Sequence, residues 1–308
     1  MITLRRRPSV NQITSFQSDG LKIACTVFQP KHVPTGGCPG IVMCQGMAGV
    51  KEYFRFPQLG RRLAQLGYVA LIWDYRGVGD SEGELGRLFP HEHSEDIRNA
   101  LTFMQTLSSV DPDRLGLIGW SFGAGMIPYV AAIDSRVKCS VAIAGWADGY
   151  RWMRNIRRQW EWIELLDRIN EDRRNRVITG RSELLQAGEI LVGDPGAKLA
   201  GERILSKIPH MSDYSGTRWS LATAEKLIEF HPIDFVHLIS PRPIMYVVAE
   251  KDATCPADHV LEMYERTKDP KKIWVIPDIP HYAVYDEPLS SQIFEATVQY
   301  LNLHLRQS

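Results

Sequence analysis

The chain has 308 residues with 36 basic and 36 acidic side chains, so its formal net charge is zero and nothing suggests a nucleic acid partner. A hydrophobic fraction of 44% is enough for a full globular core. No apolar run approaches the ~20 residues that a membrane-spanning helix needs, so we expect no membrane span.

The cysteines and the N-terminal stretch bear on the compartment. Five cysteines are scattered without C-x-x-C spacing, which predicts reduced thiols. No apolar segment follows Arg5-Arg6-Arg7, so we expect no secretory signal. Together these features predict a cytoplasmic protein, although a mature secreted chain would show the same features.

Strands and helices alternate along the first half of the chain. Asp19-Gly20 lies within an alternating pattern from Thr14 to Pro30, which predicts a β-hairpin. Further along, short continuous apolar runs alternate with runs of helical spacing. The predicted buried strands are Ile41–Cys44, Val69–Trp73, Leu115–Ile118 and Val137–Ala144, and the predicted helices are Leu59–Leu66, Glu95–Leu107 and a helix that ends at Ile133.

The alternation pauses near Trp146 and resumes late in the chain. The later elements are a strand at Ile244–Ala249, a helix at Ala257–Thr267, a strand at Ile273–Ile276 and a helix at Ser291–Leu305. This order predicts an α/β fold with a mostly parallel central sheet and helices on both faces. We expect residues 1–145 and 231–308 to form the core domain. Residues 146–230, helical in character and rich in tryptophan, are expected to form a helical cap inserted over the carboxyl edge of the sheet.

The most informative motif is Gly119-Trp120-Ser121-Phe122-Gly123. It follows a predicted strand and opens a predicted helix, which is the context of a nucleophile elbow. The glycines leave room for neighbouring backbone that a Cβ would block. Ser121 is therefore the predicted nucleophile.

A serine nucleophile needs a base, and the base needs an acid to orient it. Asp252 follows the strand Ile244–Ala249, and His281 follows the strand Ile273–Ile276. The chain order Ser, Asp, His is the order expected of this strand–elbow architecture. The sequence thus predicts a triad of Ser121, His281 and Asp252.

Other residues compete for these roles. Asp148 lies after the strand that ends at Ala144 and is the rival acid, while Asp252 has the alternative role of a helix N-cap. His259 falls in a predicted helix and is expected to be solvated, and His237 follows no strand end. Asp74 and Arg76 are expected to form a structural pair that braces a turn.

With these residues in place, the chain resembles an α/β-hydrolase of the serine hydrolase type over residues 14–145 and 240–305. Asp74-Tyr75-Arg76-Gly77-Val78-Gly79-Asp80-Ser81 resembles the family's D-x-R-G-x-G-x-S turn. The elbow and the segment Gly46–Glu52 resemble small esterases related to the prolyl-oligopeptidase and X-Pro-dipeptidyl-peptidase branch. Similar stand-alone hydrolases, some of them thioesterases or acyltransferases, occur in polyketide biosynthesis.

An oxyanion hole needs donors that point at the charge developing in the tetrahedral intermediate. The N–H of Phe122, directly after the nucleophile at a helix N-terminus, is one predicted donor. The resemblance implies that the N–H of Met47 is the other, in a turn that has Gln45 where the family usually has histidine. Trp146 directly follows a strand end, so it is the candidate substrate contact.

Neither a metal nor a cofactor is predicted. His91-Glu92-His93 lacks zinc-like spacing and is expected to be a solvated loop or helix start. The glycines at 77–79 and 119–125 do not form a dinucleotide motif.

These features predict a serine hydrolase that cleaves a carboxylic ester or thioester in a small-molecule acyl substrate. The alternatives are an acyltransferase, cyclase or lyase acting on a polyketide-like substrate, a small peptidase, and a non-catalytic ligand receptor on a hydrolase scaffold. The predicted cap could also form a homo-oligomer interface.

Overall fold

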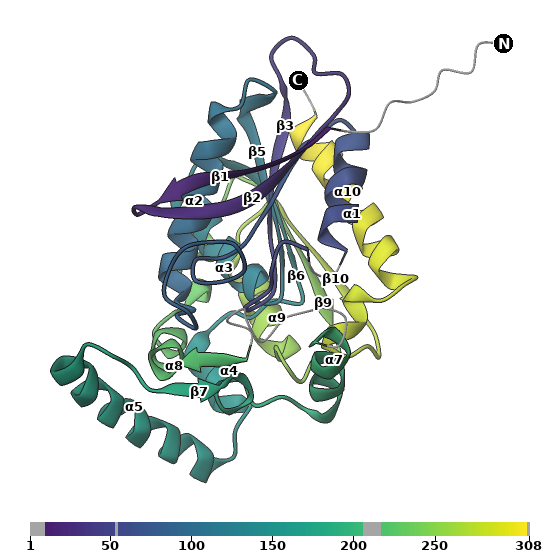
Figure 1. The fold of residues 1–308 in the computed structure, drawn as a ribbon. Coiled ribbons are helices and arrows are strands. Elements are labelled where there is room, and N and C mark those ends of the chain that lie inside the picture. The colour runs from purple at the N-terminus through teal and green to yellow at the C-terminus, as the bar shows by residue number, and fades with distance from the viewer. Residues whose placement is uncertain (1–9, 53–54, 206–216, 307–308) are drawn as a thin grey trace.

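The computed structural model describes residues 10–52, 55–205 and 217–306, and its centre is an eight-stranded sheet (Figure 1). The strand order is β1-β2-β4-β3-β5-β6-β9-β10. β1 pairs antiparallel with β2, and β2 pairs antiparallel with β4, whereas every later neighbouring pair is parallel. The expected mostly parallel sheet is confirmed. Its strands are β1 (Val10–Ser18), β2 (Leu21–Gln29), β3 (Cys38–Cys44), β4 (Val69–Trp73), β5 (Val110–Trp120), β6 (Val137–Ile143), β9 (Ile244–Ala249) and β10 (Lys271–Ile276).

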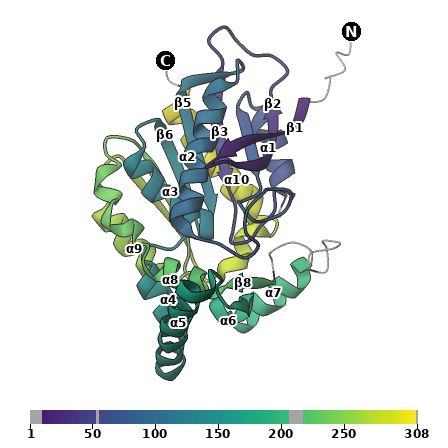
Figure 2. The same ribbon diagram turned by 60° about the vertical axis from the view of Figure 1, so that its left-hand side comes forward.

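Helices cover both faces of this sheet. α2 (Pro90–Thr106) and α3 (Phe122–Ile133) pack on one face, and α1 (Phe56–Gln65) and α10 (Leu289–Leu305) pack on the other (Figures 1 and 2). α9 (Ala257–Arg266) packs against β9. Every helix predicted for the core is present, and the bounds differ mainly at the N-termini because Pro90 and Pro57 start their helices in the first turn.

The burial of the strands explains their sequence pattern. Every residue of β3, β4 and β9 is buried, as expected of parallel strands covered on both faces. The β1–β2 hairpin turns at Asp19 and Gly20, both with positive φ, which matches the turn chemistry of a tight hairpin. The parallel strands have their carboxyl ends at the same edge of the sheet. The segment 146–230 begins at this edge, after the end of β6.

Residues 146–230, called the insertion below, lie between β6 and β9 in the chain (Figure 1). The segment is mainly helical, but it also contains a two-stranded antiparallel pair, β7 with β8, that the sequence pattern did not predict. Strands of three residues are too short to show a periodicity. Its elements are α4 (Gly149–Asn155), α5 (Gln159–Thr179), β7 (Leu184–Gln186), α6 (Ala187–Ile190), α7 (Pro195–Leu205), β8 (Arg218–Ser220) and α8 (Leu221–Ile228).

The described residues also contain the short 3-10 helices η2 (Pro232–Asp234), η3 (Val236–Leu238) and η4 (His281–Tyr285). At the base of the insertion, the N–H of Gly149 donates to the carbonyl of Phe230 at 2.9 Å. Within the described ranges, no helix combines the length and apolar character needed to cross a membrane.

Candidate active site

Ser121 lies on the turn between β5 and α3 with a backbone φ of 51° and ψ of −113°. This conformation is strained for a residue with a Cβ, so the surroundings must hold it. The Ser121 N–H donates to the carbonyl of Ile143 at 2.9 Å, and the Gly123 N–H donates to that of Gln45 at 3.0 Å. The turn is thereby fixed between β3 and β6.

The glycines of the motif are required by close backbone approach. A Cβ on Gly119 would lie 2.7 Å from the carbonyl carbon of Gly123. A Cβ on Gly123 would lie 2.4 Å from the carbonyl oxygen of Cys44. Both distances are too short for real contacts, so the elbow packs this tightly only with glycine at these positions.

The three residues of the predicted triad lie together at the carboxyl edge of the sheet. The Nε2 atom of His281 is 3.0 Å from Oγ of Ser121, and its Nδ1 atom is 2.6 Å from Oδ2 of Asp252. The second carboxylate oxygen of Asp252 accepts N–H bonds from Thr254 at 2.9 Å and Cys255 at 2.6 Å. His281 and Asp252 are buried, whereas Ser121 is partly exposed. The arrangement can therefore move a proton from an accessible hydroxyl to a held imidazole.

The competing residues have other partners. Asp148 caps α4 by accepting the N–H of Arg151 at 2.8 Å, and its other oxygen lies 3.2 Å from Nδ1 of His231. His259 is fully buried in α9 with its Nε2 atom 2.9 Å from the amide nitrogen of Asn155, so its predicted solvation was wrong. His237 is exposed on η3. None of these three residues makes a hydrogen bond with Ser121 or His281 in the described ranges.

The predicted oxyanion donors lie on either side of the nucleophile. Phe122 is the first residue of α3, and Met47 lies in the loop after β3. Among the described residues, neither backbone N–H donates to another backbone carbonyl or to a side chain. A Cβ placed on neighbouring Gly46 would lie 3.7 Å from Cβ of Ser121, so this loop is adjacent to the nucleophile. Both N–H groups therefore have no competing acceptor among the described residues, as the expected oxyanion role requires.

Gln45 braces the loop that carries Met47. Its side-chain amide donates to the carbonyls of Gly49 at 2.6 Å and Trp73 at 2.8 Å, while its own carbonyl accepts the hydroxyl of Tyr75 at 2.8 Å. The glutamine therefore supports the turn at the position where the family usually has histidine.

The loop has a second brace at its far end. Asp74 accepts the N–H of Lys51 at 2.6 Å and its ammonium at 2.7 Å, and both side chains are buried. Arg76 instead pairs with Asp96, its Nε lying 2.8 Å from Oδ2. The expected pairing of Asp74 with Arg76 was therefore wrong: each residue braces a different neighbour.

Trp146 does not have the exposure that a substrate contact needs. It is 0% exposed, its indole N–H donates to the carbonyl of Phe122 at 3.3 Å, and its ring stacks on Trp152 at 4.8 Å between centroids. A Cβ on Gly125 would lie 2.2 Å from its indole nitrogen. The expectation that Trp146 contacts the substrate is therefore corrected: Trp146 is a buried residue that packs against α3 directly after the nucleophile.

Two residues beside the nucleophile were missed by the sequence analysis. Both Cys255 and Tyr285 interact with the Ser121 side chain, and burial raises the pKa of each group well above its ordinary value. A Cβ on Gly46 would lie 3.6 Å from the Tyr285 hydroxyl. Cys255 and Tyr285 therefore stay protonated beside Ser121. No spacing rule singles them out, although each lies within four residues of a triad member.

His91-Glu92-His93 opens α2, as the helix-start interpretation predicts, but His93 is fully buried rather than solvated. Its ring lies 5.7 Å from that of Phe122 and 4.6 Å from that of Tyr75, between centroids. In the part of the chain that the structure describes, no group of three or more metal-binding side chains is arranged around a common point.

Comparisons with known proteins agree with this fold. A family model described as alpha/beta hydrolase fold matches residues 39–288. A polyketide transferase, grgF from Penicillium sp., is 26% identical over 79% of this chain and 81% of its own length. A thiohydrolase, aneE from Aspergillus aculeatus, is 23% identical over 92% of this chain and 90% of its own. The crystal structure of GrgF from Penicillium sp. sh18 superposes with a TM-score of 0.80 at 22% identity, covering 97% of this chain and 100% of that one.

Proposed function

Because the chain belongs to the α/β hydrolase family, we propose that it is a serine hydrolase that cleaves a carboxylic ester or thioester. The observation that carries the proposal is the continuous hydrogen-bonded chain from Asp252 through His281 to Ser121, with heavy-atom separations of 2.6 and 3.0 Å. A relative named as a thiohydrolase supports the thioester as one substrate class.

In the acylation step, Nε2 of His281 takes the proton from Oγ of Ser121 while that oxygen attacks the carbonyl carbon of the substrate. The carboxylate of Asp252 stabilises the resulting imidazolium and holds its tautomer. The N–H groups of Met47 and Phe122 bind the negative oxygen of the tetrahedral intermediate. When the intermediate collapses, His281 protonates the departing alcohol or thiol and an acyl-serine remains.

The second half of the cycle reverses these roles. A water molecule gives a proton to His281 and attacks the acyl carbon. When the second tetrahedral intermediate collapses, His281 returns that proton to Oγ of Ser121, and a carboxylic acid is released. The insertion, as a cap over the carboxyl edge of the sheet, selects the acyl group that reaches Ser121.

A fluorophosphonate probe tests the proposal. The wild-type chain should gain one phosphonate, located on Ser121 by peptide mass spectrometry, and Ser121→Ala should gain none. Ser140→Ala is the matched control because Ser140 is a buried serine on β6, away from the elbow. A folded wild-type protein that stays unlabelled would contradict the proposal.

Acyl transfer is the second candidate, favoured by the relative named as a polyketide transferase. In this reaction an alcohol, amine or carbon nucleophile replaces water at the acyl-serine. Product analysis with and without added acceptor separates the two functions: transfer is rejected if the free acid is the product in every case.

A further inference from the structure

α5 presents a regular row of exposed residues on the side opposite its buried face. Figure 2 shows this helix extending away from the sheet, and its core contacts come from Trp162, Leu165 and Ile169. The exposed row repeats at alternating steps of four and three residues, the spacing of a helix–helix seam. The row, called the α5 seam below, is Ile163, Asp167, Asn170, Arg174 and Val177.

The ends of the seam are apolar and unusually exposed. Ile163 is 51% exposed and Val177 is 89% exposed, and beside them Trp160 and Ile178 are 59% and 82% exposed. Large apolar side chains concentrated on one helix indicate an interaction surface, whereas single exposed ones do not.

The middle of the seam carries charges that have no ion-pair partner in the ranges that the structure describes. Among the described residues, neither Asp167 nor Arg174 forms an ion pair, although neighbouring Arg168, Arg173 and Arg176 all do. The acid stands three residues before Asn170 and the base four residues after it. The order along the seam is thus apolar, acid, amide, base, apolar.

This order is complementary to itself when one copy is reversed. If a second α5 lies antiparallel with the two-fold axis at Asn170, Ile163 lies opposite Val177 and Asn170 opposite Asn170. Asp167 then lies within one residue, about 1.5 Å of helix rise, of the level of Arg174, and this pairing occurs twice. Such reciprocity is the requirement of an isologous interface. We propose that the chain forms a homodimer through antiparallel pairing of the α5 seams of two copies.

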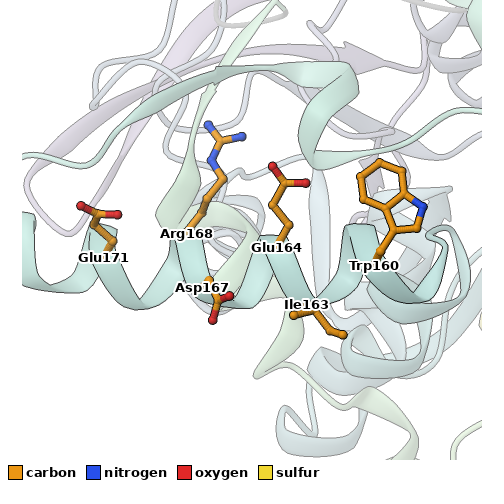
Figure 3. Close-up of a pocket in the computed structure, with 6 residues that line it drawn as sticks. All are labelled: Trp160, Ile163, Glu164, Asp167, Arg168 and Glu171. Carbon is orange, nitrogen blue, oxygen red and sulfur yellow. The ribbon is translucent and has the colours of Figure 1, made fainter.

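A shallow pocket on the surface of α5 is consistent with this pairing. Figure 3 looks onto a shallow hollow along the N-terminal half of α5, between side chains that include Trp160, Ile163 and Asp167. In the antiparallel arrangement this hollow lies opposite Val177 and Ile178 of the other copy. A helix of 21 residues is ~30 Å long, so the contact is modest and the dimer is reversible.

Sedimentation velocity over a range of concentrations tests the proposal on the full chain. The wild type should shift from 35.0 kDa towards twice that mass as concentration rises. Arg174→Asp places like charges opposite each other at two points and should raise the dimer dissociation constant at least about tenfold. Adding Asp167→Arg to it swaps both pairs and should restore dimerisation. Lys272→Asp, which changes an exposed cation on β10, should leave the dimer intact.

Cross-linking tests the register. Asn170→Cys should form an intermolecular disulfide under mild oxidation, whereas Asn175→Cys on the same helix should not, and the native cysteines are all buried. A chain that is monomeric at every concentration overturns the proposal. So does a dimer that Arg174→Asp leaves intact and that Asn170→Cys does not cross-link. Neither outcome bears on the labelling of Ser121, so failure of this inference is distinct from failure of the proposed function.

Discussion

The carboxyl edge of the sheet and the insertion are held by different means. At the sheet edge, backbone hydrogen bonds and glycine contacts fix the elbow, and the loop after β3 is tied to β4 through Gln45. The insertion is joined to the core by a few backbone hydrogen bonds, such as Ser220 N–H to the Gly86 carbonyl at 2.9 Å, and by long side chains. The indole of Trp152 donates to the carbonyl of Thr254 at 2.6 Å, and Arg151 pairs with Glu262.

The difference separates the region proposed to do the chemistry from the region proposed to choose the substrate. A reacting geometry must hold within a fraction of an ångström, which backbone contacts at a packed sheet edge provide. Contacts made by long side chains rearrange more easily, so we expect the insertion beyond Trp146 to accept other sequences without disturbing Ser121. The predictions below test this contrast, beginning with the largest expected effect.

Replacing the acid of the triad should affect chemistry without affecting the fold. Asp252→Asn leaves His281 without its carboxylate and favours the wrong tautomer, so kcat should fall about 10⁴-fold with little change in KM. Asp148→Asn is the matched control, because that acid caps α4 and should alter stability rather than kcat. Esterase kinetics and urea unfolding measure both. Equal losses of kcat in the two variants would remove the distinction between the acids.

Replacing Trp146 should affect the stability of the protein strongly, whereas replacing Trp160 should hardly affect it. Trp146→Ala opens a cavity beneath the elbow and should lower the free energy of unfolding by about 3–5 kcal/mol. Trp160→Ala removes a side chain that is 59% exposed and should change stability by less than about 0.5 kcal/mol. Urea titrations measure both changes. If Trp146→Ala kept full stability and altered only KM, Trp146 would be a substrate contact after all.

Arg157 holds part of the insertion together. It is buried, and its guanidinium donates to the carbonyls of Met153 at 2.9 Å, Glu189 at 3.0 Å and Ile190. Burial lowers its pKa to about 10. Arg157→Met leaves these carbonyls without donors and should cost about 1–3 kcal/mol.

Hydrogen exchange shows whether the stability lost in Arg157→Met is lost in the insertion or in the sheet. Hydrogen exchange should increase in α4 and α6 and stay unchanged in β5 and β6, while the exposed neighbour Arg158→Met should change neither. Increased exchange throughout the sheet would show that the insertion and the core unfold as one unit.

His93 should make the core sensitive to acid. Burial, with the charge of Arg76 adding to it, lowers its pKa to about 3 from an ordinary value of 6.5. Between these two values the unfolded chain binds a proton that the folded chain does not, so this group's share of the stability is lost as pH falls below 6.5. From pH 7 to pH 5 the loss should be about 2 kcal/mol.

His93→Leu should remove that part of the pH dependence. Urea unfolding of both proteins at pH 7 and pH 5 measures it, with the pH 7 values as the internal reference for the packing change. An identical loss in wild type and variant would mean that other groups cause the acid sensitivity.

Much of the candidate site could be predicted because its signals are local. The strand, glycine-flanked serine and helix around Ser121 occupy a continuous stretch, and Asp252 and His281 each directly follow a strand. The carboxyl ends of parallel strands meet at one edge of a sheet, so three separate local patterns lead to one place. The short β7–β8 pair could not be predicted, because three residues carry no measurable period.

The sequence by itself thus determined the sheet, the elbow and the chain order of the reacting groups, since each depends on neighbours along the chain. Only the tertiary structure decided that Asp252, not Asp148, contacts His281, that Trp146 is buried beneath Phe122, and that Tyr285 and Cys255 lie beside Ser121. These contacts join segments far apart in the chain. They depend on how distant elements pack, and no pattern within one element records which side chain from another will meet it.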